Sequence, residues 1–434
     1  MSGTRRSLSA PGLTRRTRKR PAGTLDRPVC DPRLWPLDPE VVFLNHGSFG
    51  SCPRHVLEFQ REIRDRLERQ PIQFFVRDLE PLMDEARGAL AEFLGADPDG
   101  LVFVPNATAG VNTVLRSLRF RRGDEVLVTN HEYNACRNAL NFAAERSGVR
   151  IVVADVPFPL DGAKQVLEAV LSRVTRRTRL ALLDHVTSQT GLVLPIEPLV
   201  ARLRERGIET LVDGAHAPGM VQLNLRRLGA TYYTGNCHKW ICAPKGVGFL
   251  HVQRDRRESI RPLSISHGAN SPRTDRSPFL IEFGWTGTWD ASACLSVPEA
   301  LRFVGSLVPG GWPAIMSRNR RLALAARKVI CKTLRIDLPC PDEMIGSLAS
   351  MPWPDARDAR PAKSPLYLDP LQDRLLAGYG IEVPIIPWPG PPKRLLRISA
   401  QLYNSLPQYR LLAEALSREL KLAIGSRRPR SVSV

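Results

Sequence analysis

The sequence predicts an α/β fold built on a mostly parallel central sheet flanked by helices, with a smaller α+β domain at the C-terminal end. The first observation is an alternation, from about residue 100, of short β-branched apolar runs with helical patterns. Strands that are joined by helices in this way pair in parallel. The second observation is that polar residues directly follow two of these strands, where parallel sheets bind their ligands. The third is a new helical pattern that begins near residue 301.

The expected elements follow one another in a regular order. Strands are expected at 101–105, 124–129, 149–156, 179–186 and 208–213, and helices at 108–118, 134–147, 162–173 and 195–206. A further β-like run occupies 231–235. After residue 301 come a helical pattern that reaches 334, a Pro-rich stretch at 384–392 and a final helix at 406–420. We therefore expect a large domain at 36–300, which includes an N-terminal segment, and a smaller domain at 301–425.

The positive charge is concentrated at the two ends of the chain. Residues 1–28 carry eight basic residues and one acidic residue, and residues 426–434 carry three basic residues, so these ends supply +10 of the net charge of +19. Their Arg, Ser, Pro and Gly content predicts disordered basic tails at 1–35 and 426–434. The remaining charge suits anionic small ligands as well as nucleic acid. Because no zinc-knuckle or helix-turn-helix signature occurs, we expect no specific nucleic-acid partner.

The composition indicates a soluble cytoplasmic protein. The chain has 434 residues, 43% of them hydrophobic, yet no apolar run approaches the ~18 residues of a membrane span. The N-terminal stretch has no apolar signal-peptide core, and its prolines favour an extension over an organellar transit peptide. The eight cysteines are scattered without C-x-x-C pairs, which is typical of reduced thiols and predicts no metal site.

Asp213 and Lys239 carry the functional prediction. Asp213 ends an apolar strand and is followed by a Gly-Ala-His turn that contains His216. Lys239 lies beside His238 in a Gly/Asn/His-rich turn after the run at 231–235. Pyridoxal chemistry requires these two groups, because a carboxylate keeps the pyridine nitrogen protonated and a lysine holds the cofactor and then moves protons. The pair therefore predicts a pyridoxal 5'-phosphate (PLP) site at the carboxyl edge of the sheet.

The segments VDGAHAPG (212–219) and TGNCHKW (234–240) resemble the class V aminotransferase superfamily of fold-type I PLP enzymes. Further segments resemble its isopenicillin N epimerase-like branch in the expected order: FLNHGSFGSCPRHVLE (43–58), NATAGVNTVL (106–115), HEYNACRN (131–138), DHVTSQTG (184–191), GWTGTWD (284–290) and RISAQLYNS (397–405). The resemblance covers roughly residues 36–420. It implies a fold-type I transferase fold, bound PLP, an amino-acid-derived substrate and a homodimer.

The resemblance also implies roles for individual residues. Lys239 matches the lysine that holds the cofactor as a Schiff base, Asp213 the partner of the pyridine nitrogen, and His216 a contact of the phenolic oxygen. Ser188 occupies the position where related cysteine desulfurases carry an asparagine for the same oxygen, so its role is left open. Asn236 and His238 match phosphate contacts, and Thr288 matches a residue that reaches the phosphate of the partner subunit.

Two further cofactor contacts are expected around the first helix and the HEYN segment. Thr108 and the Ala109 amide lie at a helix N-terminus, which offers free N–H groups and a positive dipole end to a phosphate. An ordinary helix cap is the alternative. Tyr133 is the better candidate for the ring that stacks on the cofactor, with His131 in reserve.

Arg397 is the expected ligand of the substrate carboxylate, because its planar guanidinium binds a carboxylate through two parallel bonds. Asn45 and His46, in the FLNHGSFG segment, are the other residues expected to bind substrate, and Arg77 is the next candidate for the carboxylate. Cysteine desulfurases of this superfamily carry a nucleophilic cysteine shortly before the arginine, whereas residues 380–396 contain none. A persulfide mechanism is therefore not expected.

Removal of a proton from the substrate Cα is common to several outcomes. Return of the proton on the other face gives epimerisation, loss of a β-substituent gives a lyase reaction such as carbon–sulfur cleavage, and formation of a keto acid gives transamination. The resembling branch contains both epimerases and carbon–sulfur lyases, so epimerisation is the first expectation and the lyase and aminotransferase outcomes stay open. A non-enzymatic alternative is an inactive relative that binds partners through its basic tails, which the intact Asp213 and Lys239 oppose.

Overall fold

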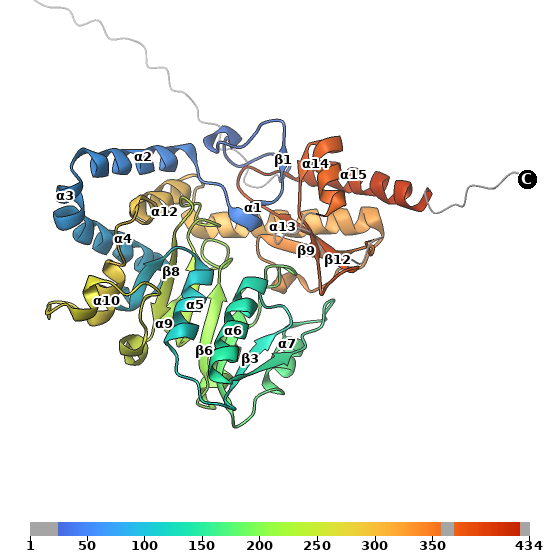
Figure 1. Cartoon of the computed structure of the whole chain (residues 1–434). Coiled ribbons are helices and arrows are strands. Elements are labelled where there is room, and N and C mark those ends of the chain that lie inside the picture. The colour runs from blue at the N-terminus through green and yellow to red at the C-terminus, as the bar shows by residue number, and fades with distance from the viewer. Residues whose placement is uncertain (1–24, 357–368, 426–434) are drawn as a thin grey trace, which may run out of the picture.

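The computed structural model describes residues 25–356 and 369–425 (Figure 1). These residues form a seven-stranded sheet and a three-stranded sheet, each packed against helices, and a third sheet of two short strands. Within these residues, the larger sheet has seven strands in the order β2-β8-β7-β6-β5-β3-β4. The strands from β4 to β7 are parallel, whereas β8 is antiparallel to both β7 and β2. The mostly parallel sheet expected from the sequence is confirmed. Its strands are β2 (Leu101–Val104), β3 (Glu125–Thr129), β4 (Arg150–Ala154), β5 (Thr178–Asp184), β6 (Glu209–Gly214), β7 (Tyr232–Asn236) and β8 (Gly248–Val252).

Helices pack on both faces of this sheet, so its central strands are buried on both sides. All residues of β3, β7 and β8 are buried, which explains why apolar residues run through these strands without alternating with polar ones. Successive residues still pack into different clusters, as Leu211 does on one face and Val212 on the other. The connecting helices are α5 (Ala107–Ser117), α6 (Asn134–Ser147), α7 (Ala163–Leu171), α8 (Ile196–Arg204) and α9 (Leu225–Leu228).

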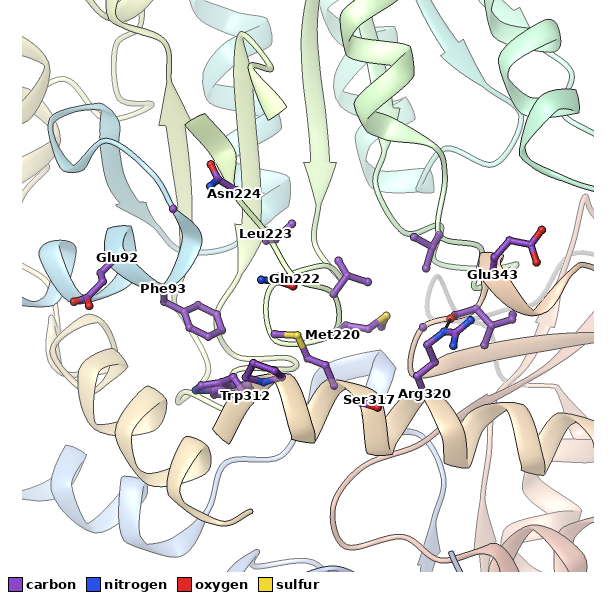
Figure 2. A pocket seen from close by; sticks show the side chains of 17 residues that line it. Glu92, Phe93, Met220, Gln222, Leu223, Asn224, Trp312, Ser317, Arg320 and Glu343 are labelled. Atoms are coloured by element: carbon purple, nitrogen blue, oxygen red, sulfur yellow. Dashed lines mark hydrogen bonds between the residues drawn. The ribbon is translucent and has the colours of Figure 1, made fainter. Parts of the chain in front are cut away.

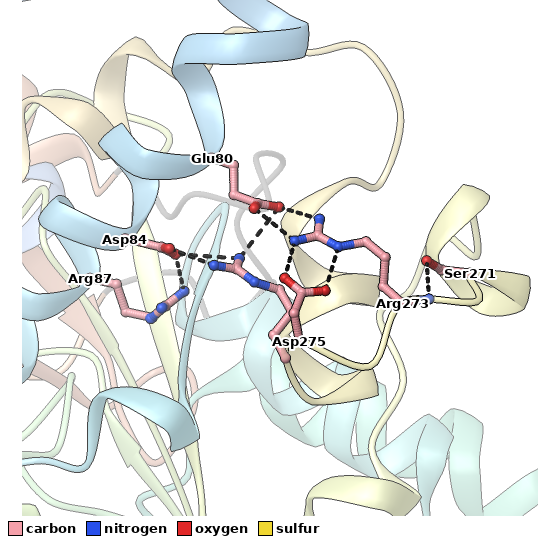
Figure 3. Close-up of polar contacts among 7 residues, drawn as sticks. Glu80, Asp84, Arg87, Ser271, Arg273 and Asp275 are labelled. Atoms are coloured by element: carbon pink, nitrogen blue, oxygen red, sulfur yellow. Dashed lines mark hydrogen bonds and ion pairs between the residues drawn. The ribbon is translucent and has the colours of Figure 1, made fainter.

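A second layer of helices comes from residues 54–94 and 278–306. It comprises α2 (Arg54–Arg69), α3 (Pro71–Gln73), η2 (Phe74–Asp78), α4 (Leu79–Leu94), α10 (Pro278–Gly284), α11 (Ser292–Leu295) and α12 (Val297–Ser306). An ion-pair network joins α4 to the segment before α10 (Figure 3). Arg273 binds both oxygens of Glu80 at 2.7 and 3.0 Å, and Arg276 binds Asp84 at 2.5 Å. These contacts hold the segment that leads, through α10, to Thr288.

The smaller domain is built on an antiparallel sheet in the order β11-β12-β9. Its strands are β9 (Leu348–Trp353), β11 (Ile385–Pro387) and β12 (Arg394–Ser399). The long helix α13 (Gly311–Leu334) packs against β9 and against α15 (Leu406–Gly425), and α14 (Pro370–Tyr379) precedes β10 (Ile381–Glu382). The small α+β domain expected at the C-terminal end is therefore present, and β12 brings Arg397 into it.

The N-terminal segment packs on this smaller domain. β1 (Val42–Phe43) pairs in parallel with β10, and α1 (His46–Phe49) lies against β12. Residues 25–35 are also packed: Trp35 is 1% exposed, and the Val29 N–H donates to the Leu402 carbonyl. The expectation of a disordered tail as far as residue 35 is wrong for these eleven residues. The prediction was based on the basic composition of the whole stretch, whereas a single buried tryptophan anchors its last part. Residues 1–24 and 426–434 lie outside the described part of the chain.

A cavity of about 610 Å³ lies between α4, α13 and the loops at 220–224 and 343–346 (Figure 2). Phe93, Met220 and Trp312 form apolar walls, and Arg320 and Glu343 lie towards one end. None of the residues expected to bind cofactor or substrate lines it. Among residues 25–356 and 369–425, no helix is long and apolar enough to cross a membrane.

Candidate active site

Lys239 lies in the long connection between β7 and β8, at the carboxyl end of β7. Its Nζ is 3.1 Å from His216 Nε2. The backbone on either side is fixed by α1: the Lys239 carbonyl accepts a hydrogen bond from His46 Nε2 at 3.0 Å, and a side chain at Gly50 would lie 2.1 Å from the His238 carbonyl oxygen. Gly50 also has φ of 70°, which favours glycine. The N-terminal segment thus supports the lysine-bearing loop.

Asp213 ends β6, the strand beside β7, and is 4% exposed. Its Oδ1 accepts the Ala215 N–H at 2.8 Å, and its Oδ2 accepts the Cys136 S–H at 3.1 Å. Burial raises the pKa of Asp213, while these hydrogen bonds and the positive charge of Lys239 act in the opposite direction. His216, the residue directly after Ala215, accepts the Trp240 indole N–H on Nδ1 at 3.4 Å. Burial lowers the pKa of His216, so its ring is neutral.

Arg397 enters the site from the smaller domain. Its Nη1 donates to the Ser188 carbonyl at 2.6 Å and lies 3.3 Å from Ser188 Oγ, and its Nη2 donates to Ser48 Oγ at 2.8 Å. Ser48 donates in turn to Asn45 Oδ1, and Asn45 Nδ2 donates to Glu382. The Arg397 Nε is buried and has no hydrogen-bond partner within the described residues. Burial lowers the pKa of Arg397 to about 10.

Lys239 and Arg397 interact through their charges. Burial and, next, the positive charge of Arg397 together lower the pKa of Lys239 to about 8, against the opposing effect of Asp213. Over the described part of the chain, neither cation forms an ion pair with a carboxylate side chain. Two buried cations without an anionic partner are costly unless a ligand supplies the negative charge. The arrangement therefore fits an anionic ligand between the two domains.

The N-terminus of α5 is capped by two asparagine side chains. Asn106 Oδ1 accepts the Ala109 N–H at 2.9 Å, and Asn236 Oδ1 accepts the Ala107 N–H at 2.8 Å. The Ala109 amide and the Asn236 oxygen, both expected to contact phosphate, are thus bonded within the protein. Thr108 lies between the two capped amides, and His238 Nδ1 bonds the Val247 carbonyl at 3.0 Å. The phosphate contacts stay predictions, with Thr108 the best placed of them.

The two candidates for the stacking ring have different surroundings. His131 is 1% exposed, and its nitrogens lie 2.8 Å from Thr190 Oγ1 and 2.9 Å from the Val156 carbonyl. Tyr133 is the N-cap residue of α6, is 38% exposed, and affects the pKa of Arg397. Tyr133 is therefore a side chain near Arg397 with part of its surface open to a ligand.

The four other residues that were expected to bind substrate or phosphate differ in how far they are buried. His46 is fully buried and hydrogen-bonded to Tyr403 as well as to the Lys239 carbonyl, which suits support of the loop. Asn45 reaches Arg397 only through Ser48. Thr288 is exposed in the turn after α10, and Arg77 is exposed in η2, on a surface shared with Trp285 and Arg273 rather than with Arg397. The substrate-binding and phosphate-binding roles of these residues stay predictions.

Three residues next to the site are not expected from the sequence: Ser48, Cys136 and Trp240. Ser48 contacts Arg397, Cys136 contacts Asp213, and Trp240 contacts His216. Ser48 and Cys136 lie within the FLNHGSFG and HEYNACRN segments, so the resemblance marks the regions but not the side chains. Within the described residues, no group of three His, Cys, Asp or Glu side chains is arranged to hold a metal ion.

The family model for aminotransferase class V matches residues 70–342, well over half of the chain. The chain belongs to the class V aminotransferase family. This class V enzyme is 36% identical to an isopenicillin N epimerase of Streptomyces clavuligerus, over 88% of its own length and 95% of that protein. It is 32% identical to a probable chloroplastic L-cysteine desulfhydrase of Arabidopsis thaliana, over 88% and 83% of the two chains.

Solved structures of similar fold include the cystine C–S lyase C-DES with its product cysteine persulfide, with a TM-score of 0.70 and 23% identity over 87% of this chain and 97% of that one. The Escherichia coli cysteine desulfurase CsdA has a TM-score of 0.71 and 20% identity over 90% and 99%. Another C-DES structure has glycine covalently linked to its PLP cofactor. The class V enzyme has the fold-type I architecture and depends on PLP. A buried amine of lowered pKa, a buried carboxylate and an unpaired Arg397 Nε fit that cofactor and its amino-acid ligand.

Proposed function

We propose that the class V enzyme epimerises the Cα of an amino-acid-derived substrate, as an isopenicillin N epimerase-like enzyme. The observation that carries the proposal is that Lys239 and Arg397 lie in one buried site, close enough for the charge of Arg397 to lower the pKa of Lys239. Lys239 can act there as a base, and Arg397 can bind a carboxylate. The 36% identity to isopenicillin N epimerases from two organisms supports this outcome over the others.

Each of the four residues in the site has a separate role in the proposed reaction. Bound PLP supplies an electron sink for the electron pair that remains when a Cα bond breaks. Arg397 holds the substrate α-carboxylate and so fixes the orientation of Cα. Lys239 Nζ, with its pKa of about 8, takes up the Cα proton near neutral pH. Asp213 would hold the ring nitrogen as its counter-charge, and the neutral His216, whose Nε2 lies 3.1 Å from Lys239 Nζ, would contact the phenolic oxygen.

Carbon–sulfur β-elimination is the second candidate function. The L-cysteine desulfhydrase relatives, at 28–33% identity, and the C–S lyase fold favour it. Epimerisation and β-elimination both begin with removal of the Cα proton, so Lys239 and Arg397 could act in either reaction. A desulfurase reaction is disfavoured, because residues 380–396 lack cysteine and burial raises the pKa of Cys136, the thiol nearest Asp213.

A single experiment in D₂O separates these outcomes. The purified holoenzyme is incubated separately with isopenicillin N and with L-cystine, and the products are followed by chiral chromatography and mass spectrometry. Epimerisation is expected to give both Cα configurations carrying deuterium, with no keto acid. Release of pyruvate and a sulfur product would establish the lyase instead, and a keto acid formed only with an added amino acceptor would establish transamination.

We further infer a cytoplasmic homodimer. Eight unpaired cysteines favour a reducing compartment. The exposed Thr288 turn, held by α10 and its ion-pair network, supports a contact across a two-fold axis. Size-exclusion chromatography with light scattering tests the assembly, and a fully active monomer would refute it.

A further inference from the structure

Cys136 and Asp213 form a side-chain contact between α6 and the end of β6. The Cys136 Sγ lies 3.1 Å from Asp213 Oδ2, and the Ala215 N–H binds the other carboxylate oxygen at 2.8 Å. Each oxygen therefore has one protein donor and keeps a lone pair for another. The two donors come from different elements, so together they fix the plane of the carboxylate.

The contact lies in a closed environment. Cys136 is 1% exposed and packs in the apolar cluster that contains Val111, Leu140 and Leu211. The acidic groups that face it are Asp213, Asp184 and Glu132, all buried. Asp184 ends the neighbouring strand β5 in register with Asp213. Negative neighbours and burial both favour the neutral thiol, so Cys136 acts as a hydrogen-bond donor and not as a thiolate.

Cys136 also connects Asp213 to the residues at the start of α6. That helix begins at Asn134, directly after Tyr133, its N-cap residue. Cys136 is the third residue of the helix, one position before Arg137, which pairs with Glu132. A rotation of the first turn would therefore move Tyr133 and the donor to Asp213 together.

We propose that Cys136 is a positioning residue that orients the Asp213 carboxylate towards the pyridine nitrogen of PLP. Its S–H holds Oδ2 so that the remaining lone pair faces the ring, and it links this orientation to the α6 turn that carries Tyr133. The inference rests on the proposed role of Asp213. It assigns no nucleophilic role to Cys136.

The test measures the affinity of the apoenzyme for PLP by quenching of tryptophan fluorescence, with the visible absorbance of the bound cofactor as a second readout. Cys136→Val removes the donor and replaces the thiol with a somewhat larger apolar side chain, and is expected to weaken PLP binding by about 3- to 10-fold and to shift the absorbance band. Cys136→Ser keeps a donor and should remain within about 2-fold of the unmodified protein. Cys136→Ala serves if the valine variant does not fold.

Cys331 in α13 offers a matched control, because it is a buried helical cysteine that packs in the apolar core and, among the described residues, hydrogen-bonds only to a backbone carbonyl. Cys331→Val should leave PLP affinity unchanged. Urea unfolding of every variant reports any loss of packing. Unchanged PLP affinity in both Cys136→Val and Cys136→Ala would overturn the inference.

A double-substitution cycle separates positioning from packing. In an Asp213→Asn background, Cys136→Val should have almost no further effect on PLP affinity, because the charge that the thiol orients is absent. The same loss in both backgrounds would show that Cys136 acts through packing and would overturn the inference. If Asp213→Asn itself leaves affinity and absorbance unchanged, the proposed role of Asp213 fails, which is a distinct result.

Discussion

At the scale of single residues, the site depends on charges that are buried without the usual partners. Arg397 donates to two neutral oxygens, from Ser188 and Ser48, and keeps a buried Nε without a partner. Lys239 contacts a neutral imidazole rather than a carboxylate. Desolvation without ion pairing lowers the pKa of both groups. These two features lead to two predictions, one about substrate binding and one about pH.

Arg397→Ala should weaken amino-acid binding by about one to two orders of magnitude, because a charge-assisted bidentate pair is lost. Arg397→Lys should restore only part of the affinity, since an ammonium group cannot reproduce the planar fork. The measurement is a spectral titration of the holoenzyme with an amino acid and with its decarboxylated amine. The unmodified enzyme should prefer the acid, and the alanine variant should lose most of that preference. Equal preference in both proteins would place the carboxylate elsewhere, with Arg77 the next candidate.

Capture of PLP by the apoenzyme should accelerate as the pH rises and level off above about pH 8. Only the neutral amine attacks an aldehyde, and burial together with the charge of Arg397 lowers the Lys239 pKa from 10.5 to about 8. Without Arg397 the ammonium form is less disfavoured, so Arg397→Ala should move the midpoint to higher pH. Stopped-flow absorbance gives the midpoint. An unmoved midpoint in Arg397→Ala would show that the two charges do not interact.

The control for this measurement is Lys239→Ala. It should bind PLP only non-covalently, so that borohydride treatment leaves no pyridoxyl label on the protein. A covalent label on this variant would mean that another residue holds the cofactor.

At the scale of elements, the part of the site that lies on one sheet can be predicted from the sequence. Asp213 and Lys239 follow neighbouring parallel strands, and the carboxyl ends of such strands meet at one edge. The contact between Arg397 and Ser188 joins residues 209 positions apart in different domains, and no local pattern encodes it. β8 is likewise not expected, because its five residues follow a glycine-containing turn without a clear period, and because it pairs antiparallel in a mostly parallel sheet.

The packing of residues 25–35 was also not predicted, because the basic, polar composition of the N-terminal stretch indicated a disordered tail. Trp35 is 1% exposed, and its ring packs edge-on against Tyr403 at 5.1 Å. Trp35→Ala should lower the free energy of unfolding by about 3–5 kcal/mol, as truncation of a buried aromatic residue usually does. Urea denaturation followed by circular dichroism measures it. Arg33→Ala is the control from the same segment: its pair with Asp31 is exposed, so this variant should unfold at almost the same urea concentration as the unmodified protein. Similar losses in both variants would show that the segment is not anchored by Trp35.

At the scale of the whole molecule, the residues proposed to form the active site come from three parts of the chain that are distant in sequence. The large sheet supplies Asp213 and Lys239, the small sheet supplies Arg397, and the N-terminal segment supplies Ser48 and the support from His46. A single chain also exposes Thr288 in the turn after α10. A fourth contribution, from the partner's turn to the phosphate, would explain the exposure of this threonine.

If two copies share their sites, defects placed on different sides of one site should complement each other. Lys239→Ala removes the lysine, and Thr288→Asp places a negative charge against the phosphate of the partner's site. Each variant alone should be inactive or nearly so. In a mixed dimer, one site receives both defects and the other receives neither, so random assortment should leave about a quarter of the sites intact. Activity of the mixture, measured after co-expression with two affinity tags and normalised to bound PLP, is the test. If Thr288 acted within its own chain, each mixed dimer would contain one site lacking Lys239 and one site carrying the Thr288 change, and no activity would return.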